Sequence, residues 1–464
     1  MIILPGDVLL EIFKFYVDQV DRADAWHALV HVCREWRNVV FASPRWLHMK
    51  LLCTNRNPAK KMLDIWPALP IVIDAIIMNS RQSGVTNVIA ALKQHHRVCG
   101  INIRNVSHSL LTSTVMEKQF PELADLTLHS NGKNLPVVPD LFLGGSAPRL
   151  QSLEFRGIPF PFPALGKLLL SATNLVTLRL LDIPNSAIIS SELIVTSLSA
   201  LTMLKEFFIG FRSPRPRAGQ EHLPLLKRLA LPCLTEFYFK GNSECLEDIL
   251  GRIDTPALDR ASITFFNQLI FDTPLLRDFL SRTKLFQEVH LADVTPAGSY
   301  IKFTLSRRKG MADCSILDVR ISCSVAEWQL SSLAQICSAS LPPLPTLDRL
   351  NIHEEMFMPS RSRLEWPNDM ETSQWLELLR PFVTVRKLDI LATFSCADQV
   401  ALALREFTGY TVTEVLPALR QVFVACPFPP GPIQEAFAPF STARHLTGRT
   451  VLVDVHPHGG RSMS

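Results

Sequence analysis

The segment Leu123-Ala124-Asp125-Leu126-Thr127-Leu128-His129-Ser130-Asn131 has apolar residues at its first, fourth and sixth positions. This spacing predicts a short strand, because alternate side chains of a strand point to the same face and are buried together. The same pattern, ending on the same residue type, returns at Leu234–Asn242. One such strand cannot bury its apolar face alone, so the pattern predicts a fold only where it recurs.

The pattern recurs along most of the chain, in looser form and at intervals of mostly 24 to 31 residues. Its apolar triplets are Val98-Ile101-Ile103, Leu123-Leu126-Leu128, Leu150-Leu153-Phe155, Leu175-Leu178-Leu180, Leu204-Phe207-Ile209, Leu234-Phe237-Phe239, Leu258-Ala261-Ile263, Phe286-Val289-Leu291, Ile316-Val319-Ile321, Leu347-Leu350-Ile352, Val385-Leu388-Ile390 and Leu419-Val422-Val424. Helical spacing of apolar residues appears between the triplets, at 85–92, 246–253, 330–337 and 375–382. Strands and helices that alternate at this period predict an α/β repeat.

These triplets and their period resemble the leucine-rich repeat. The resemblance implies a solenoid with parallel strands on its concave side and helices on its convex side. We expect this solenoid over residues 71–455. We expect it to be irregular, because only the repeats at Leu123–Asn131 and Leu234–Asn242 end on an asparagine. The alternative, a doubly wound α/β domain, would require a glycine-rich first turn, and the sequence has none.

The first fifty residues follow a different pattern. Leu9, Ile12, Phe13 and Tyr16 have helical spacing, and Asp7 is the expected N-cap of this helix. A second helical stripe runs from Trp26 to Val40, and Pro44 is expected to end it. So small a helical unit buries little by itself, so it either docks to a partner or caps a solenoid. Periodicity alone leaves both interpretations open.

Two runs in this segment, Leu4–Phe13 and Leu29–Arg37, resemble the two halves of an F-box, and Trp46 resembles the aromatic residue that closes the motif. The resemblance extends to the fungal F-box/leucine-rich-repeat type, with counterparts at Trp26-His27 and at 63–70. It implies a three-helix F-box at 1–50 that binds a Skp-type adaptor and, through it, a cullin. Carried over to this sequence, the adaptor-binding residues are Leu4, Pro5, Leu9, Ile12, Phe13, Val32, Cys33 and Trp36.

Residues 51–70 are expected to connect this domain to the solenoid, and residues 456–464 to form a disordered tail. Three stretches interrupt the repeats, at 211–222, 299–313 and 354–371. The first is rich in arginine and proline, and the second is typical of a hairpin. Basic loops of this kind suit an acidic partner but are as often solvated turns.

The residue between the last two apolar positions of each repeat is expected to point out of the concave sheet. These residues are therefore candidates for binding a protein target, since aromatic residues and arginine anchor many interfaces. The candidates are Glu154, Arg179, Phe208, Tyr238, His290, Arg320, Asn351 and Phe423.

Composition excludes several other functions. Charged residues are 19% of the chain and its net charge is +4, which argues against a dedicated nucleic-acid binder. No signal peptide or membrane span is visible, and the ten cysteines form no Cys-x-x-Cys pair, so we expect a reducing cytoplasmic or nuclear location. We find no nucleotide-binding, metal-binding or hydrolase motif, and therefore expect no cofactor and no enzymatic activity.

Two functions remain. The first is the substrate receptor of a cullin-based SCF-type ubiquitin ligase, with the F-box on the adaptor and the solenoid on an unknown protein substrate. The second is a scaffold unrelated to ubiquitin, whose helical head only caps the solenoid.

Overall fold

The computed structural model describes most of the chain. The described residues are 4–20, 25–44, 46–56, 59–77, 82–131, 138–184, 191–214, 228–268, 270–283, 288–309, 312–323, 325–353, 372–391, 394–406, 413–426 and 431–457. The chain divides into two compact units, unit 1 at Met1–Arg212 and unit 2 at Ser213–Ser464.

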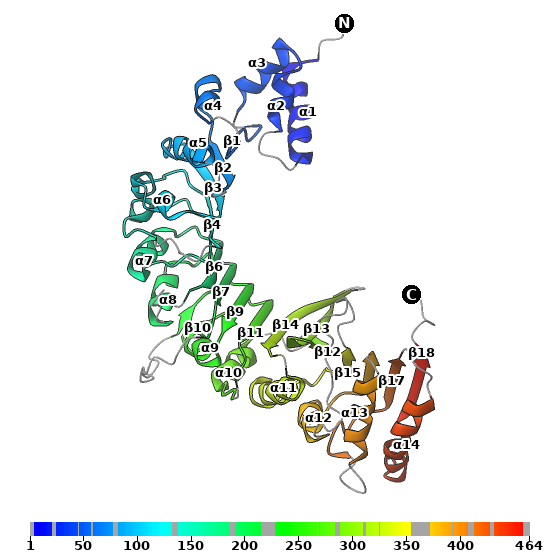
Figure 1. Cartoon of the computed structure of the whole chain (residues 1–464). Coiled ribbons are helices and arrows are strands. Elements are labelled where there is room, and N and C mark those ends of the chain that lie inside the picture. Colours follow the sequence, from blue (N-terminus) through cyan, green and yellow to red (C-terminus); the bar gives the residue numbers. More distant parts are fainter. Residues whose placement is uncertain are drawn as a thin grey trace. The chain divides into compact units, whose positions relative to one another are not determined.

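Unit 1 begins with a helical head, formed by α1 (Gly6–Gln19), α2 (Trp26–Val30) and α3 (Arg34–Ala42) (Figure 1). The sequence predicted one continuous helix from Trp26 to Val40, and this is wrong. Cys33 is extended, with φ −155° and ψ 172°, and its Sγ accepts the Trp36 N–H at 3.4 Å. This N-cap starts a new helix, so the chain turns between α2 and α3.

The expected N-cap of the first helix is also corrected. Pro5 precedes α1 as its N-cap, and Asp7 lies inside the first turn. The carboxylate there still favours the helix, because it lies near the positive end of the helix dipole.

Unit 1 continues as a parallel sheet whose strands pair in chain order. They are β1 (Leu51–Thr54), β2 (Ile71–Ile76), β3 (Val98–Arg104), β4 (Asp125–His129), β5 (Ser152–Arg156), β6 (Thr177–Ile183) and β7 (Glu206–Phe211). The connections contain α4 (Ala59–Ile65), α5 (Gln82–Leu92), α6 (His108–Leu111), η1 (Thr114–Glu117), η2 (Phe142–Gly145), α7 (Phe162–Ser171) and α8 (Ser191–Leu198), with the longer helices on one face of the sheet (Figure 1).

The sheet begins earlier than expected. Residues 51–70 were predicted to be a connection, but they contain β1 and α4, and Leu51 pairs with Ile71. The sequence missed this strand because it is only four residues long and has no preceding apolar residue at the repeat spacing.

The core of unit 1 lies between the sheet and its helices. Leu126 and Leu128 are fully buried, whereas Thr127 between them is half-buried on the other face. Adjacent repeats approach so closely that Gly157, with φ +65°, lies where a Cβ atom would be 2.3 Å from the Ser130 carbonyl oxygen. Only glycine fits this turn.

Unit 2 contains a nine-stranded sheet within its described residues. In spatial order its strands are β9 (Glu236–Gly241), β11 (Arg260–Phe265), β14 (Ala312–Ser322), β13 (Tyr300–Lys309), β12 (Val289–Ala297), β15 (Arg349–His353), β16 (Lys387–Leu391), β17 (Gln421–Cys426) and β18 (Leu452–Pro457). Its helices are α9 (Ser243–Leu250), α10 (Pro274–Arg282), α11 (Ala326–Ser340), α12 (Thr372–Leu379), α13 (Phe394–Arg405) and α14 (Gly431–Leu446). Two short strands, β8 (Leu229–Ala230) and β10 (Ile253–Asp254), pair separately.

A meander interrupts the repeats in the middle of unit 2. The hairpin expected at 299–313 is present as β13 and β14, and β13 is antiparallel to both β12 and β14. As a result β11 pairs with β14 rather than with β12, the next repeat strand in the sequence. The expectation of a sheet with only parallel strands is therefore correct for every strand pair of both units except those that involve β13.

The end of unit 2 also differs from the expectation. His456 and Pro457, placed in a disordered tail by the sequence, belong to β18 and pair with Ala425 and Cys426 of β17. Residues 458–464 of that predicted tail lie outside the described residues, as do the loop residues 215–222 and 354–371.

Candidate functional site

The helical head has an apolar surface that its own packing does not use. Val8, Ile12 and Phe15 lie on one stripe of α1, at i, i+4 and i+7, and are 41%, 47% and 68% exposed. Val32, at the turn between α2 and α3, is 58% exposed. Large apolar residues exposed on a small helical unit are typical of an interaction site.

A second stripe of α1 forms the interior of the head. Leu9 and Phe13 are buried, and the Phe13 ring lies 4.7 Å from the Trp36 ring, between centroids. Arg37 fixes α3 against α2 by donating from Nε to the Val30 carbonyl oxygen at 2.9 Å. The apolar arc of α1 is therefore wide enough to pack internally and to present a second apolar face outward.

The structure separates the eight predicted adaptor-binding residues into two groups. Leu9 and Phe13 are buried and Trp36 is half-buried against Phe13. The others are on the surface, and they are Leu4, Pro5, Ile12, Val32 and Cys33.

The sequence prediction missed two exposed residues of the head, Val8 and Phe15. Their spacing from Ile12, at i−4 and i+3, is the signal that could have found them. We define the docking stripe as Val8, Ile12, Phe15 and Val32.

An aromatic cluster joins the head to the first repeat. The Trp66 ring stacks on His27, with centroids 5.0 Å apart and planes 17° apart, and lies edge-on to Trp26 at 5.2 Å. Trp26 is buried, and its Nε1 donates to the Lys50 carbonyl oxygen at 2.9 Å. The head is thus packed directly against the segment that precedes β2.

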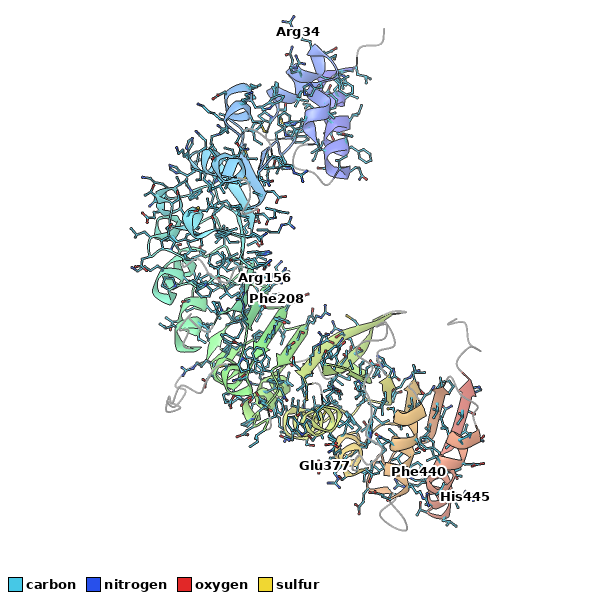
Figure 2. The ribbon with its side chains drawn as sticks, in the orientation of Figure 1. Arg34, Arg156, Phe208, Glu377, Phe440 and His445 are labelled. Atoms are coloured by element: carbon cyan, nitrogen blue, oxygen red, sulfur yellow. The ribbon has the colours of Figure 1, made fainter. Side chains whose placement is uncertain are left out.

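A second candidate surface is the face of the unit 1 sheet that turns away from the helices. Glu154, Arg179 and Phe208 are direct cross-strand neighbours on β5, β6 and β7, as the sequence predicted for residues that point out of the sheet. The Arg179 guanidinium lies 4.7 Å from the Phe208 ring centroid and 2.8 Å from Glu206. Figure 2 labels Phe208 and Arg156, which belong to β7 and β5 of this sheet.

Glu154 is the most constrained group of this surface. Its Oε1 lies 2.8 Å from the His129 Nε2, and Arg156 and Arg179 lie within 3.8 Å of its carboxylate. The hydrogen bond from His129 lowers the pKa of Glu154 below its usual range, and the nearby positive charges add to this. The surface is therefore an ordered network of charges of both signs.

The corresponding face of unit 2 carries the remaining candidates. Tyr238, Asn351 and Phe423 belong to one row of outward-facing residues that crosses the sheet from β9 to β17. Asn351 donates from Nδ2 to Asp293 at 2.8 Å, and the neighbouring Asp389 lies 2.7 Å from the Arg349 Nε.

Two predictions in unit 2 are corrected by register. His290 is exposed but is not in this row, because β12 pairs with β15 three positions further along than expected, so that Asp293 lies opposite Asn351. Arg320 faces outward as predicted but lies in the adjacent row, since Asp318 rather than Arg320 pairs with Ser262.

No metal site is apparent in the described part of the chain. No group of three or more His, Cys, Asp or Glu residues there is arranged to hold a metal ion. Among the same residues, no helix has the length and apolarity needed to cross a bilayer. No protein-family model matches the chain, and no curated protein matches it.

Proposed function

We propose that this protein is the substrate-recognition subunit of a cullin-based SCF-type ubiquitin ligase. The head, as an F-box, binds a Skp-type adaptor, and the outward faces of the two sheets bind a protein target. The chain itself performs no chemistry, and it raises the effective concentration of the target near the ligase.

The observation that carries the proposal is the docking stripe. Its four side chains are large, apolar and 41% to 68% exposed, although α1 has a separate stripe that forms the interior. Exposure of this much apolar surface is unfavourable in water and is relieved by burial against a partner. The F-box resemblance of the same segment identifies that partner as the adaptor.

The outward sheet faces support the second half of the proposal. They combine aromatic and arginine side chains, such as Phe208 and Arg179, in fixed positions set by cross-strand pairing. Rigid aromatic and arginine groups are favoured anchors of protein interfaces.

The test is co-purification of the full chain with a Skp-type adaptor. The native chain is expected to form a stoichiometric complex, and the variant Ile12→Asp/Val32→Asp is expected to form none, because it places charge on the docking stripe. The matched control is Ile65→Asp, which changes an exposed isoleucine on α4, outside the head, and is expected to leave the complex intact. Leu9→Asp is unsuitable, since Leu9 is buried and its substitution would unfold the head.

A second candidate function is a scaffold whose head serves only as a cap. The contact between Trp66 and the head favours it, because a cap must pack on the first repeat. It predicts no adaptor complex with the native chain, and circular dichroism of Ile12→Asp/Val32→Asp that is unchanged from the native chain. If both the native chain and this variant form the complex, the docking stripe is not the adaptor-binding surface.

A further inference from the structure

The meander of unit 2 brings together basic residues that are far apart in the sequence. Lys240 of β9 pairs with Thr264 of β11, Thr264 pairs with Arg320 of β14, and Arg320 pairs with Lys302 of β13. All four side chains point away from the helices, since their strand neighbours Phe239, Ile263, Val319, Ile301 and Phe303 are buried. We call Lys240, Arg320 and Lys302 the basic row.

Two members of the basic row oppose each other directly. Lys302 and Arg320 are Cα partners in an antiparallel pair of strands, where opposed side chains lie about 5 Å apart at Cβ. Like charges in this position are destabilising. A pairing that weakens the fold is expected where the charges serve another purpose.

The nearby carboxylate relieves only one of these two charges. Asp318 lies 3.1 Å from the Lys302 Nζ and also receives hydrogen bonds from Thr304 and Ser315, at 2.9 and 3.0 Å. Within the described residues, no ion pair is formed by Arg320, which is exposed and lies 4.3 Å from the Tyr300 ring centroid. Its guanidinium lies over an aromatic face, an arrangement that stabilises a cation without neutralising it.

The surroundings of the basic row contain no opposing charge on one side. The residues two positions further along, toward the carboxyl ends of β9, β11 and β14 and toward the amino end of β13, are Asn242, Phe266, Ser322 and Tyr300, of which Asn242 and Phe266 lie just beyond the strand ends. None of these carries a charge. The positive potential of the row therefore extends over a polar and aromatic border rather than over carboxylates.

We propose that the basic row of unit 2 binds a segment of a protein partner that is rich in aspartate and glutamate. The segment lies across the strands, with one acidic side chain near Lys240 and another at Arg320, whose charge Asp318 does not offset. This inference rests on the proposed function, in which the segment belongs to the ubiquitination target, and it names the chemistry by which that target is recognised.

The spacing of the cations favours carboxylates over a phosphate group. Lys240 is two strands away from Arg320, about 10 Å at the usual strand spacing, and only Arg320 and Lys302 are adjacent. A single phosphate is best held by cations that converge on one point. Cations distributed along a row match a series of separate single charges.

The test is fluorescence anisotropy of a labelled decaglutamate peptide with the full-length chain, at about 0.15 M salt. The peptide is expected to bind and decaglutamine is not. Arg320→Gln is expected to weaken binding roughly tenfold, the loss typical of one hydrogen-bonded charge. The matched control is Arg277→Gln, which removes an exposed arginine on the helical side of the same unit, on α10. It is expected to have no effect.

The melting temperature of the same variants gives an independent readout. Arg320→Gln removes the like-charge pair, so it is expected to melt at the same temperature as the native chain or higher. A lower melting temperature with unchanged peptide binding would show that Arg320 serves only the fold. Equal binding by the native chain and Arg320→Gln would also overturn the proposal.

Two further probes test whether the basic row prefers another class of partner. Tighter binding of a phosphoserine peptide or of a single-stranded oligonucleotide than of decaglutamate would contradict the proposal. Because the measurement needs no adaptor, it succeeds or fails separately from the co-purification that tests the proposed function.

Discussion

At the scale of single residues, Glu247 of α9 is an acidic group in an unfavourable position. It is 8% exposed and accepts the backbone N–H groups of Leu275 and Leu276, at 2.7 and 2.8 Å, in the first turn of α10. Burial raises the pKa of Glu247 from 4.5 to about 7, against the effect of the two hydrogen bonds. Its anionic form is therefore costly in the fold.

This shift makes the stability of unit 2 depend on pH. Since the pKa of the folded state lies above that of the unfolded state, the contribution is complete below pH 4.5 and is lost as pH rises to about 7. Its size is about 3 kcal/mol at the most. Glu247→Gln removes the proton exchange, so we expect its free energy of unfolding to vary less over this range. Urea unfolding at several pH values measures this, and an unchanged pH dependence would contradict the assignment.

At the scale of elements, the meander depends on one buried side chain of α11. Gln329 is fully buried, and its Nε2 donates to the carbonyl oxygens of Ala297 and Cys323, at 2.7 and 2.8 Å. These carbonyls lie at the end of β12 and just after β14. The amide thus joins both outer strands of the meander to one helix.

Gln329→Leu is expected to loosen the meander. It leaves two buried carbonyl oxygens without their donor, at a cost of about 2 kcal/mol. Hydrogen exchange of the amides in β12 and β13 is expected to become faster than in β16. Ser331→Ala on the same helix is the control, since the Ser331 hydroxyl bonds only its own helix, at the Trp328 carbonyl oxygen. Equal exchange in Gln329→Leu and the native chain would show that the amide is dispensable.

The element scale also shows why sequence reasoning succeeded and failed. Eleven of the twelve apolar triplets correspond to strands, because period-two burial against helices is a local property. In the other, Phe286 lies outside the described residues, and β12 buries Val289, Ala292 and Val294 rather than Leu291. Strand order is not local, so nothing in the triplets of β12 and β14 indicated that β13 lies between them. The register between β12 and β15 is likewise not local, and it places Asp293 rather than His290 opposite Asn351.

The candidate site was predicted less completely than the fold. A helical stripe identifies apolar positions but not which of them face the interior, so Leu9 and Ile12 looked equivalent in the sequence. Their burial depends on where α3 places Trp36, which is a tertiary contact. Arg320 was found as an outward residue, but its opposition to Lys302 depends on the antiparallel strand.

At the scale of the molecule, the proposed function requires the head, which is to bind the adaptor, to be held in a defined relation to the repeats, which are to bind the target. In unit 1 the contact that does so is aromatic, between Trp66 and the pair Trp26 and His27. Such ring contacts contribute about 0.5–1.5 kcal/mol each beyond the burial of their area. The cluster is therefore strong enough to couple the head to the first repeat.

Trp66→Ala is expected to leave adaptor binding unchanged and to reduce ubiquitin transfer to the target. Among the described residues, the ring contacts of Trp66 are with Trp26, His27, His31 and Phe41 and not with a residue of the docking stripe, so the adaptor complex should form as with the native chain. Limited proteolysis should cleave the variant between the head and β2 faster, because the ring contacts are lost. Ubiquitin transfer to a bound target should fall, since the target is no longer held at a fixed position.

Trp328→Ala, at an exposed tryptophan of α11 in unit 2, is the control and is expected to match the native chain in all three measurements. Slower cleavage than in the native chain, or loss of the adaptor complex, would show that Trp66 supports the docking stripe itself rather than the connection behind it.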